Sequence, residues 1–140
     1  MKRHLYKELI AWKKSTRRKP LIVQGARQVG KTFLLKEFGR LAYANLAYFN
    51  FEQEPGLEQI FNQSMNVSFL ISNLSAFYGK KITPEDTLIF FDEIQASPKA
   101  VTSLKYFCED AKDFHVVAAG SLLGVSVTRN TSFPVGKVNF

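Results

Sequence analysis

The chain has 140 residues, a hydrophobic content of 46% and a net charge of +7. This length suits one domain, and the many apolar side chains exclude a disordered polypeptide. No apolar run is long enough to span a bilayer, and the single cysteine, Cys108, cannot form an internal disulfide. We therefore expect a globular protein in the cytoplasm, without a membrane partner.

Hydrophobic periodicity and turn residues predict helices that alternate with strands. The helices are expected over residues 4–15, from near 30, around 57–61, over 67–78 and from 98 onward. The strands are expected over residues 21–23, 46–51, 87–91 and 114–119. This alternation is typical of an α/β fold with a parallel sheet, whose ligand site lies outside the carboxyl ends of the strands.

Apolar stripes indicate which helical side chains face the core. The expected inward residues are Leu5, Leu9, Trp12, Leu34, Leu35, Phe38, Leu41, Leu57, Ile60, Phe61, Val67, Leu70, Ile71, Leu74, Phe77, Tyr78, Val101, Leu104 and Cys108. Gly79 is expected to end the helix over 67–78. Ser97 is expected to cap the following helix, with Pro98 in its first turn.

The first predicted strand runs into a loop that matches the pattern G-x-x-x-x-G-K-[ST] and opens a helix, which is the setting of a phosphate-binding P-loop. Glycines permit backbone N–H groups to surround the β-phosphate of a nucleotide. Lys31 is expected to reach the β- and γ-phosphates, and the Thr32 hydroxyl to ligate Mg²⁺. The residues expected to bind the nucleotide are Gly25, Ala26, Arg27, Gln28, Val29, Gly30, Lys31, Thr32 and Phe33.

Two carboxylates, Asp92 and Glu93, follow the most apolar predicted strand. Phosphoryl transfer needs a carboxylate on a rigid element to hold Mg²⁺, so Asp92 is the second expected metal ligand. Glu93 is placed to act as a general base on the attacking water. Ser121 follows the fourth strand, where ATPases with an additional central strand place a residue that senses the γ-phosphate or orients the water. A small turn residue is the alternative interpretation of Ser121.

The acidic pair also separates classes of P-loop protein. A GTPase is expected to carry Asp-x-x-Gly after this strand and Asn-Lys-x-Asp further on, and the sequence contains neither motif. Small-molecule kinases usually lack the adjacent glutamate and carry a lid, of which the sequence shows no sign. ATP is therefore the expected nucleotide.

Basic residues gather between Lys13 and Lys19. Such a cluster can mark a nucleic-acid surface, serve a bound nucleotide or form a solvated helix face. No interleaved aromatic residues, zinc-finger spacing or RNA-recognition signature supports nucleic acid. DNA therefore stays an alternative partner, beside a protein partner or a second copy of the chain.

Five segments together resemble prokaryotic AAA-type ATPases of unassigned cellular role. They are RKPL (18–21), GARQVGKT (25–32), FDEIQ (91–95), GSLLG (120–124) and SFPVGK (132–137). The resemblance runs from about Leu5 to Phe140 and implies a three-layer α/β/α P-loop NTPase fold of the AAA type. It implies that Asp92 and Glu93 are the Walker B pair and that Ser121 is sensor 1.

The same resemblance implies that the chain is the N-terminal part of a longer protein. Residues 1–19 are then a leading helix and basic segment, and residues 20–140 are a P-loop core that stops as a fifth strand begins. Such proteins continue into the rest of the ATPase module, a winged-helix-like segment and a C-terminal domain of unknown function. Sensor 2 and any arginine finger are implied beyond Phe140 or on a neighbouring subunit, and Arg129 matches no defined motif.

The sequence therefore predicts ATP binding and Mg²⁺-dependent ATP hydrolysis, slow in the isolated chain because an arginine finger is missing. The alternative is a nucleotide-gated module that binds a protein or DNA partner, with slow hydrolysis or none.

Overall fold

The computed structural model of the chain describes residues 2–24 and 29–120, with side chains described over 5–23 and 32–120. The predicted loop residues 25–28, Ser121 and the tail to residue 140 lie outside the described residues. No described helix is both long and apolar enough to cross a membrane.

Within the described residues, four strands form one parallel sheet in the order β1-β4-β3-β2. The strands are β1 (Leu21–Gln24), β2 (Asn45–Asn50), β3 (Thr87–Asp92) and β4 (His115–Gly120). They lie within about one residue of the predicted ranges. Because all of them run in the same direction, their carboxyl ends meet at one edge of the sheet. The last of the described strands, β4, lies between β1 and β3, which is the additional central strand that was expected.

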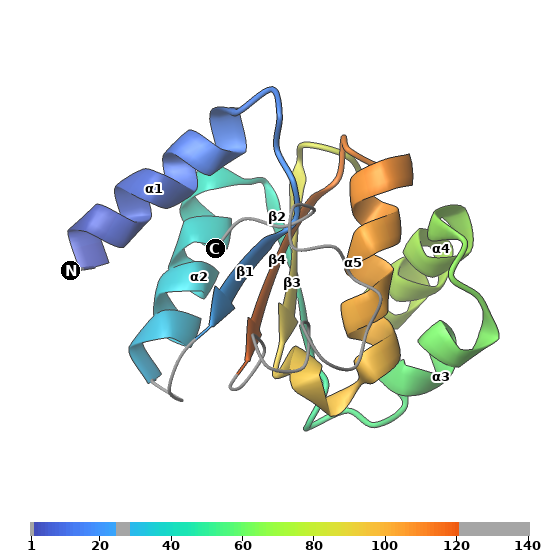
Figure 1. Ribbon diagram of the computed structural model, residues 1–140. Coiled ribbons are helices and arrows are strands. Elements are labelled where there is room, and N and C mark those ends of the chain that lie inside the picture. Colours follow the sequence, from blue (N-terminus) through green and yellow to red (C-terminus); the bar gives the residue numbers. More distant parts are fainter. Residues whose placement is uncertain (1, 25–28, 121–140) are drawn as a thin grey trace.

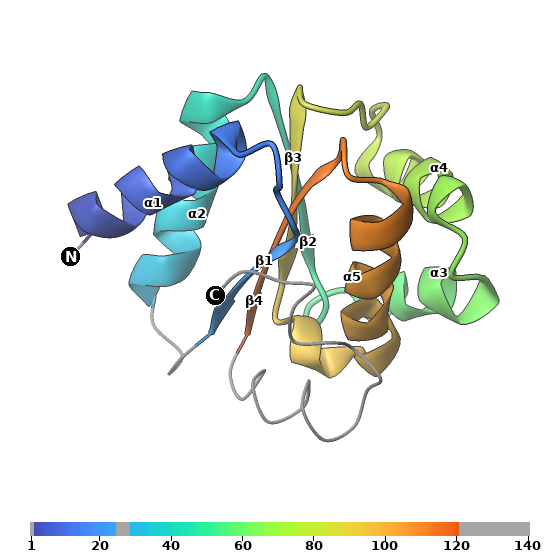
Figure 2. The ribbon, with the colours of Figure 1, turned by 45° about the horizontal axis from the view of Figure 1, so that its top comes forward.

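Helices cover both faces of this sheet, as Figures 1 and 2 show. On one face lie α1 (Lys2–Lys14) and α2 (Val29–Ala42), and on the other lie α3 (Leu57–Gln63), α4 (Val67–Tyr78) and α5 (Pro98–Asp110). A short 3₁₀ helix, η1 (Ile94–Ala96), connects β3 to α5. The predicted three-layer α/β/α fold is confirmed.

Each face of β3 is fixed by its own aromatic cluster, because successive strand residues point to opposite sides of a sheet. Phe91 packs toward α3 and α5, with its ring centroid 5.5–6.1 Å from those of Phe49, Phe51, Phe61 and Phe107. Its neighbour Phe90 belongs to the opposite core, with α1 and α2. All six residues of β3 are buried, so the strand is a rigid support for whatever follows it.

Local signals in the sequence place the ends of two helices correctly. The Ser97 hydroxyl accepts a hydrogen bond of 3.3 Å from the Ala100 N–H at the start of α5. Gly79 ends α4 in the left-handed conformation, with φ of 93°, which glycine adopts at little cost. Gly39 has a different function, because a Cβ there would lie 2.6 Å from the Leu46 side chain. Glycine thus lets α2 lie close against β2.

For two residues, the predicted burial in the core is wrong. Leu41 is 67% exposed and Phe77 is 43% exposed. Both lie on the margin of an apolar stripe in the last turn of a helix. In that part of α2, Ala42 and the following Tyr43 pack against the sheet instead of Leu41. Phe77 contacts the core only at one side, with its ring 6.2 Å from that of Phe49.

Candidate nucleotide site

The predicted site lies at the carboxyl edge of the sheet. There β1 ends at Gln24 and α2 begins at Val29, so the predicted loop joins a strand end directly to a helix start (Figure 1). The N–H groups in the first turn of a helix have no partner within the helix, and the helix dipole is positive at that end. Lys31 and Thr32 belong to this first turn, although the side chain of Lys31 lies outside the description. The backbone arrangement is therefore suited to a phosphate group.

Thr32 and Asp92, the two predicted metal ligands, are brought together. The Thr32 hydroxyl donates a hydrogen bond of 3.3 Å to Oδ2 of Asp92, which is only 4% exposed. This contact joins the first turn of α2 to the end of β3. Sequence reasoning predicted both residues, and the sheet order places them at the same edge.

The chemistry of these donors fits Mg²⁺, which prefers oxygen ligands and usually binds one or two protein groups together with substrate phosphates and water. Among the described residues, no three His, Cys, Asp or Glu side chains gather into a metal-binding cluster. A cation at this site would thus take its remaining ligands from phosphate and water.

Tyr48 also contacts the Asp92 carboxylate, and the sequence did not predict it. Its hydroxyl donates to the same Oδ2 over 2.6 Å, while the Glu93 N–H donates to Oδ1 over 2.9 Å. Burial raises the pKa of Tyr48, and its hydrogen bond to Asp92 raises this pKa further, so the hydroxyl keeps its proton. Both carboxylate oxygens are therefore held by donors.

Asn50 extends this network to the loop after β2. Its side-chain N–H donates to the Tyr48 hydroxyl over 3.2 Å. Its carbonyl oxygen accepts from the N–H groups of Glu52 at 2.9 Å and Gln53 at 3.1 Å. The alternation within β2 puts Tyr48 and Asn50 on one side of the strand, and the register pairs Asn50 with Asp92. Sequence alternation could have grouped the two polar residues, but only the register brings them to Asp92.

Glu93 follows Asp92 in the left-handed region, with φ of 52° and ψ of 43°. This conformation is uncommon for a residue with a side chain. The Gln95 side-chain N–H donates to Oε1 of Glu93 over 2.8 Å. The predicted general base thus lies beside the predicted metal ligand, with one of its carboxylate oxygens bonded to Gln95. The sequence predicted Glu93 but assigned no role to Gln95.

One further cation lies near these residues. The Lys36 ammonium lies 4.1 Å from the centre of the Tyr48 ring, four residues after Thr32 on α2. Since helical residues four apart lie on the same side, Thr32 and Lys36 both face this edge of the sheet.

Comparison with known proteins agrees with this arrangement. A family described as AAA domain matches residues 17–140. The chain belongs to the AAA domain family. Searches of curated proteins and of solved structures found no match. The resemblance inferred from the sequence motifs is therefore confirmed at the level of the family.

The basic cluster of this AAA domain lies away from the predicted phosphate site. Arg18 donates to the backbone carbonyls of Lys13 at 2.9 Å, Ser15 at 3.1 Å and Lys112 at 3.2 Å. These contacts tie the end of α1 to the connection between α5 and β4, at the amino edge of the sheet. A cavity of about 650 Å³ there also contains the acidic residues Glu85, Asp86 and Asp113. The basic cluster thus lies at the opposite edge of the sheet from the predicted nucleotide site.

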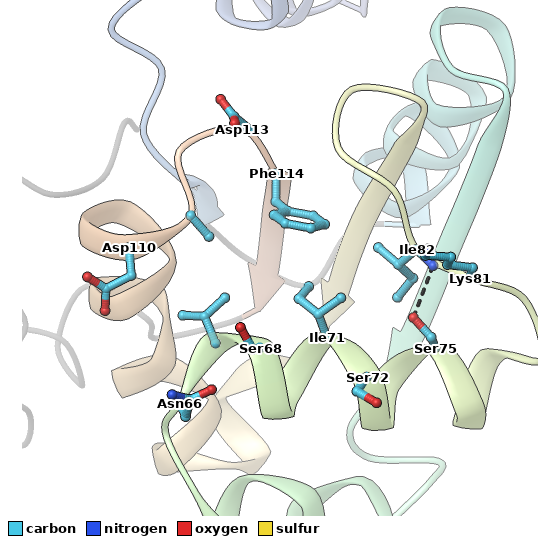
Figure 3. Close-up of a pocket in the computed structure, with 12 residues that line it drawn as sticks. Asn66, Ser68, Ile71, Ser72, Ser75, Lys81, Ile82, Asp110, Asp113 and Phe114 are labelled. Atoms are coloured by element: carbon cyan, nitrogen blue, oxygen red, sulfur yellow. Dashed lines mark hydrogen bonds between the residues drawn. The ribbon is translucent and has the colours of Figure 1, made fainter.

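Another cavity of the AAA domain, of about 620 Å³, lies between α4 and the end of α5. Figure 3 shows side chains from both helices along it, including Ser68, Ser72 and Asp110. The Ser75 hydroxyl accepts a hydrogen bond of 3.0 Å from the Ile82 N–H at its end. None of the predicted site residues whose side chains the structure describes lines this cavity.

Proposed function

We propose that this AAA domain binds ATP together with Mg²⁺ and hydrolyses the bond between the β- and γ-phosphates. The observation that carries the proposal is the 3.3 Å contact between the Thr32 hydroxyl and the Asp92 carboxylate. It joins the helix that opens after the P-loop pattern to the acidic end of a buried strand. ATP is preferred to GTP because Glu93 follows Asp92 and the guanine-reading motif is absent from the sequence.

Each residue has a distinct part in this proposal. The loop N–H groups and Lys31 bind the phosphates, and Thr32 and Asp92 hold the cation. The Mg²⁺ would neutralise charge on the β- and γ-phosphate oxygens. Glu93 accepts a proton from the attacking water, and its place directly after Asp92 supports this role. Ser121 is proposed to sense the γ-phosphate from the end of the central strand.

Nucleotide binding is tested by titrating the chain with a fluorescent ATP analogue in the presence of Mg²⁺. Replacing Lys31 by Ala is expected to weaken binding at least tenfold, because charged hydrogen bonds to phosphate are among the stronger ones. Lys105→Ala is the matched control, since Lys105 lies on α5 next to Tyr106 and away from the site. Equal affinities of the two variants would contradict a P-loop function for this segment.

A second candidate, the nucleotide-gated binding module, is favoured by one observation. The hydrogen bond from Gln95 occupies Oε1 of Glu93, which is one of the two oxygens that could accept a proton from water. In such a module, ATP binding orders a surface for a partner and hydrolysis only resets it.

The variant Glu93→Gln separates the two functions. If the AAA domain is an ATPase, this variant binds ATP as the wild type does and loses multiple-turnover release of phosphate. If it is a switch, the wild type itself shows little turnover, and the variant retains both ATP and partner binding.

A further inference from the structure

One oxygen of the Asp92 carboxylate accepts hydrogen bonds from two hydroxyl groups. The Thr32 hydroxyl approaches Oδ2 to 3.3 Å, and the Tyr48 hydroxyl approaches the same atom to 2.6 Å. The contact with Tyr48 is much the shorter, and it lies within the range of strong O–H···O⁻ hydrogen bonds. The strand β2, which carries none of the predicted site residues, thus supplies the closer of these two contacts with the proposed metal ligand.

The donors and acceptors around Tyr48 have only one consistent assignment. An ionised carboxylate only accepts hydrogen bonds, so the single hydroxyl proton of Tyr48 must point to Asp92. The Tyr48 oxygen then accepts from the Asn50 side-chain N–H at 3.2 Å. This orientation leaves the Asn50 carbonyl oxygen to accept from two backbone N–H groups in the following turn, as its distances of 2.9 and 3.1 Å require.

Packing holds the Tyr48 ring as well as its hydroxyl. The ring meets that of Phe90 on the neighbouring strand edge to face, with centroids 5.1 Å apart. The Lys36 ammonium lies above the same ring. Asn50 is 9% exposed, so the residue that orients the hydroxyl is itself buried. A side chain fixed by packing and by hydrogen bonds holds its partner in a defined position.

We propose that Tyr48 is a positioning residue that holds Oδ2 of Asp92 in place for Mg²⁺ binding. The Glu93 N–H fixes the other oxygen, Oδ1, so together the two donors set the plane of the carboxylate. Thr32, whose own contact with Asp92 is longer, is then left to turn its hydroxyl oxygen toward the cation. This inference rests on the proposed function, because it assumes that Asp92 binds Mg²⁺ with the nucleotide.

The test is the variant Tyr48→Phe, which keeps the ring and removes the hydroxyl. Binding of a fluorescent ATP analogue is measured in EDTA and then across a series of Mg²⁺ concentrations. Groups that hold a metal ligand in place usually contribute 10–100-fold to metal affinity. We expect the Mg²⁺ concentration at half-saturation to rise about tenfold, with nucleotide binding in EDTA close to that of the wild type.

Tyr43→Phe is the matched control. Tyr43 also makes a 2.6 Å hydrogen bond through its hydroxyl, to Nδ1 of His115 at the amino edge of the sheet. This substitution also removes a hydrogen-bonded tyrosine hydroxyl, but it does not change the hydrogen bonds of Asp92. We expect the Mg²⁺ dependence of this variant to equal that of the wild type.

Three results would overturn the inference, and they are distinguishable. An unchanged or lower Mg²⁺ requirement in Tyr48→Phe would show that the hydroxyl does not position Asp92. An equal loss of nucleotide binding in EDTA would show a general structural role instead. If the wild type bound nucleotide without any dependence on Mg²⁺, the proposed function would fail first and the inference with it.

Discussion

The two edges of the sheet each contain a tyrosine hydroxyl in a hydrogen bond of 2.6 Å, but in different surroundings. At the carboxyl edge, Tyr48 donates to the Asp92 carboxylate, which also meets Thr32 at the start of α2. At the amino edge, Tyr43 bonds to His115, which is 3% exposed and lies edge to face with Trp12. The first tyrosine holds a charged group that faces a helix start, and the second holds a neutral ring inside an aromatic cluster. The charge of the partner, rather than the length of the bond, distinguishes the proposed functional edge from the structural one.

The largest expected effect comes from removing the charge at the carboxyl edge. Asp92→Asn keeps the shape of the side chain and its place beside Tyr48 but removes the charged metal ligand. We expect the Mg²⁺-dependent affinity for ATP to fall about 100-fold, because a cation contributes several kcal/mol of charge stabilisation at such sites. Calorimetric titration with and without Mg²⁺ measures the change.

Asp86→Asn is the control for this prediction at the opposite edge. Asp86 directly precedes β3, whereas Asp92 ends it. Asp86 also lines the cavity of about 650 Å³ at the amino edge. A similar loss of Mg²⁺ dependence in both variants would mean that net charge, and not the position of Asp92, determines cation binding.

The amino edge is expected to respond to pH instead. Burial, together with the positive charges of Arg18 and Lys13, lowers the pKa of His115 from 6.5 to about 4. The unfolded chain then binds a proton at this histidine between pH 6.5 and 4, while the folded chain does not. Stability due to neutral His115 is therefore complete above pH 6.5 and is lost as the pH falls toward 4.

We expect this loss to reach about 2 kcal/mol between pH 7 and pH 5. It is measured by urea unfolding, followed through the fluorescence of Trp12, in the wild type and in His115→Phe. Because carboxylates titrate in both proteins, only the difference between the two curves reports His115. The wild type's advantage over the variant should shrink as the pH falls, and a constant difference would contradict a neutral buried His115.

The contrast between the edges also explains what the sequence could predict. Local patterns predicted all described strands to within about one residue, because alternation and turn residues act over short distances. The P-loop pattern and the acidic pair predicted Thr32, Asp92 and Glu93, since each belongs to a short motif with its own chemistry. The burial of Leu41 was predicted wrongly, because periodicity does not reveal how far the neighbouring layer extends.

The sequence could not predict residues whose contacts depend on how distant strands pair. Tyr48 meets Asp92 only because β2 and β3 pair with Asn50 opposite Asp92. No local pattern encodes that pairing. Gln95 was part of a family motif, but its contact with Glu93 depends on the left-handed turn at Glu93 itself. The motifs thus predicted the groups proposed to do the chemistry, and the register revealed the groups that hold them.

The smallest effect that we predict concerns this second kind of residue. Gln95→Ala removes the hydrogen bond of 2.8 Å to Glu93 and leaves Asp92 and its partners in place. A hydrogen bond of this type contributes about 1 kcal/mol, and about 1.4 kcal/mol corresponds to a tenfold change in rate. If Gln95 orients the general base, kcat for ATP hydrolysis falls about fivefold while ATP affinity stays constant. Gln59→Ala, an exposed position on α3, is the control and should leave both values unchanged. A rise in kcat would contradict orientation and show that Gln95 restrains Glu93, which is the behaviour expected of the nucleotide-gated module.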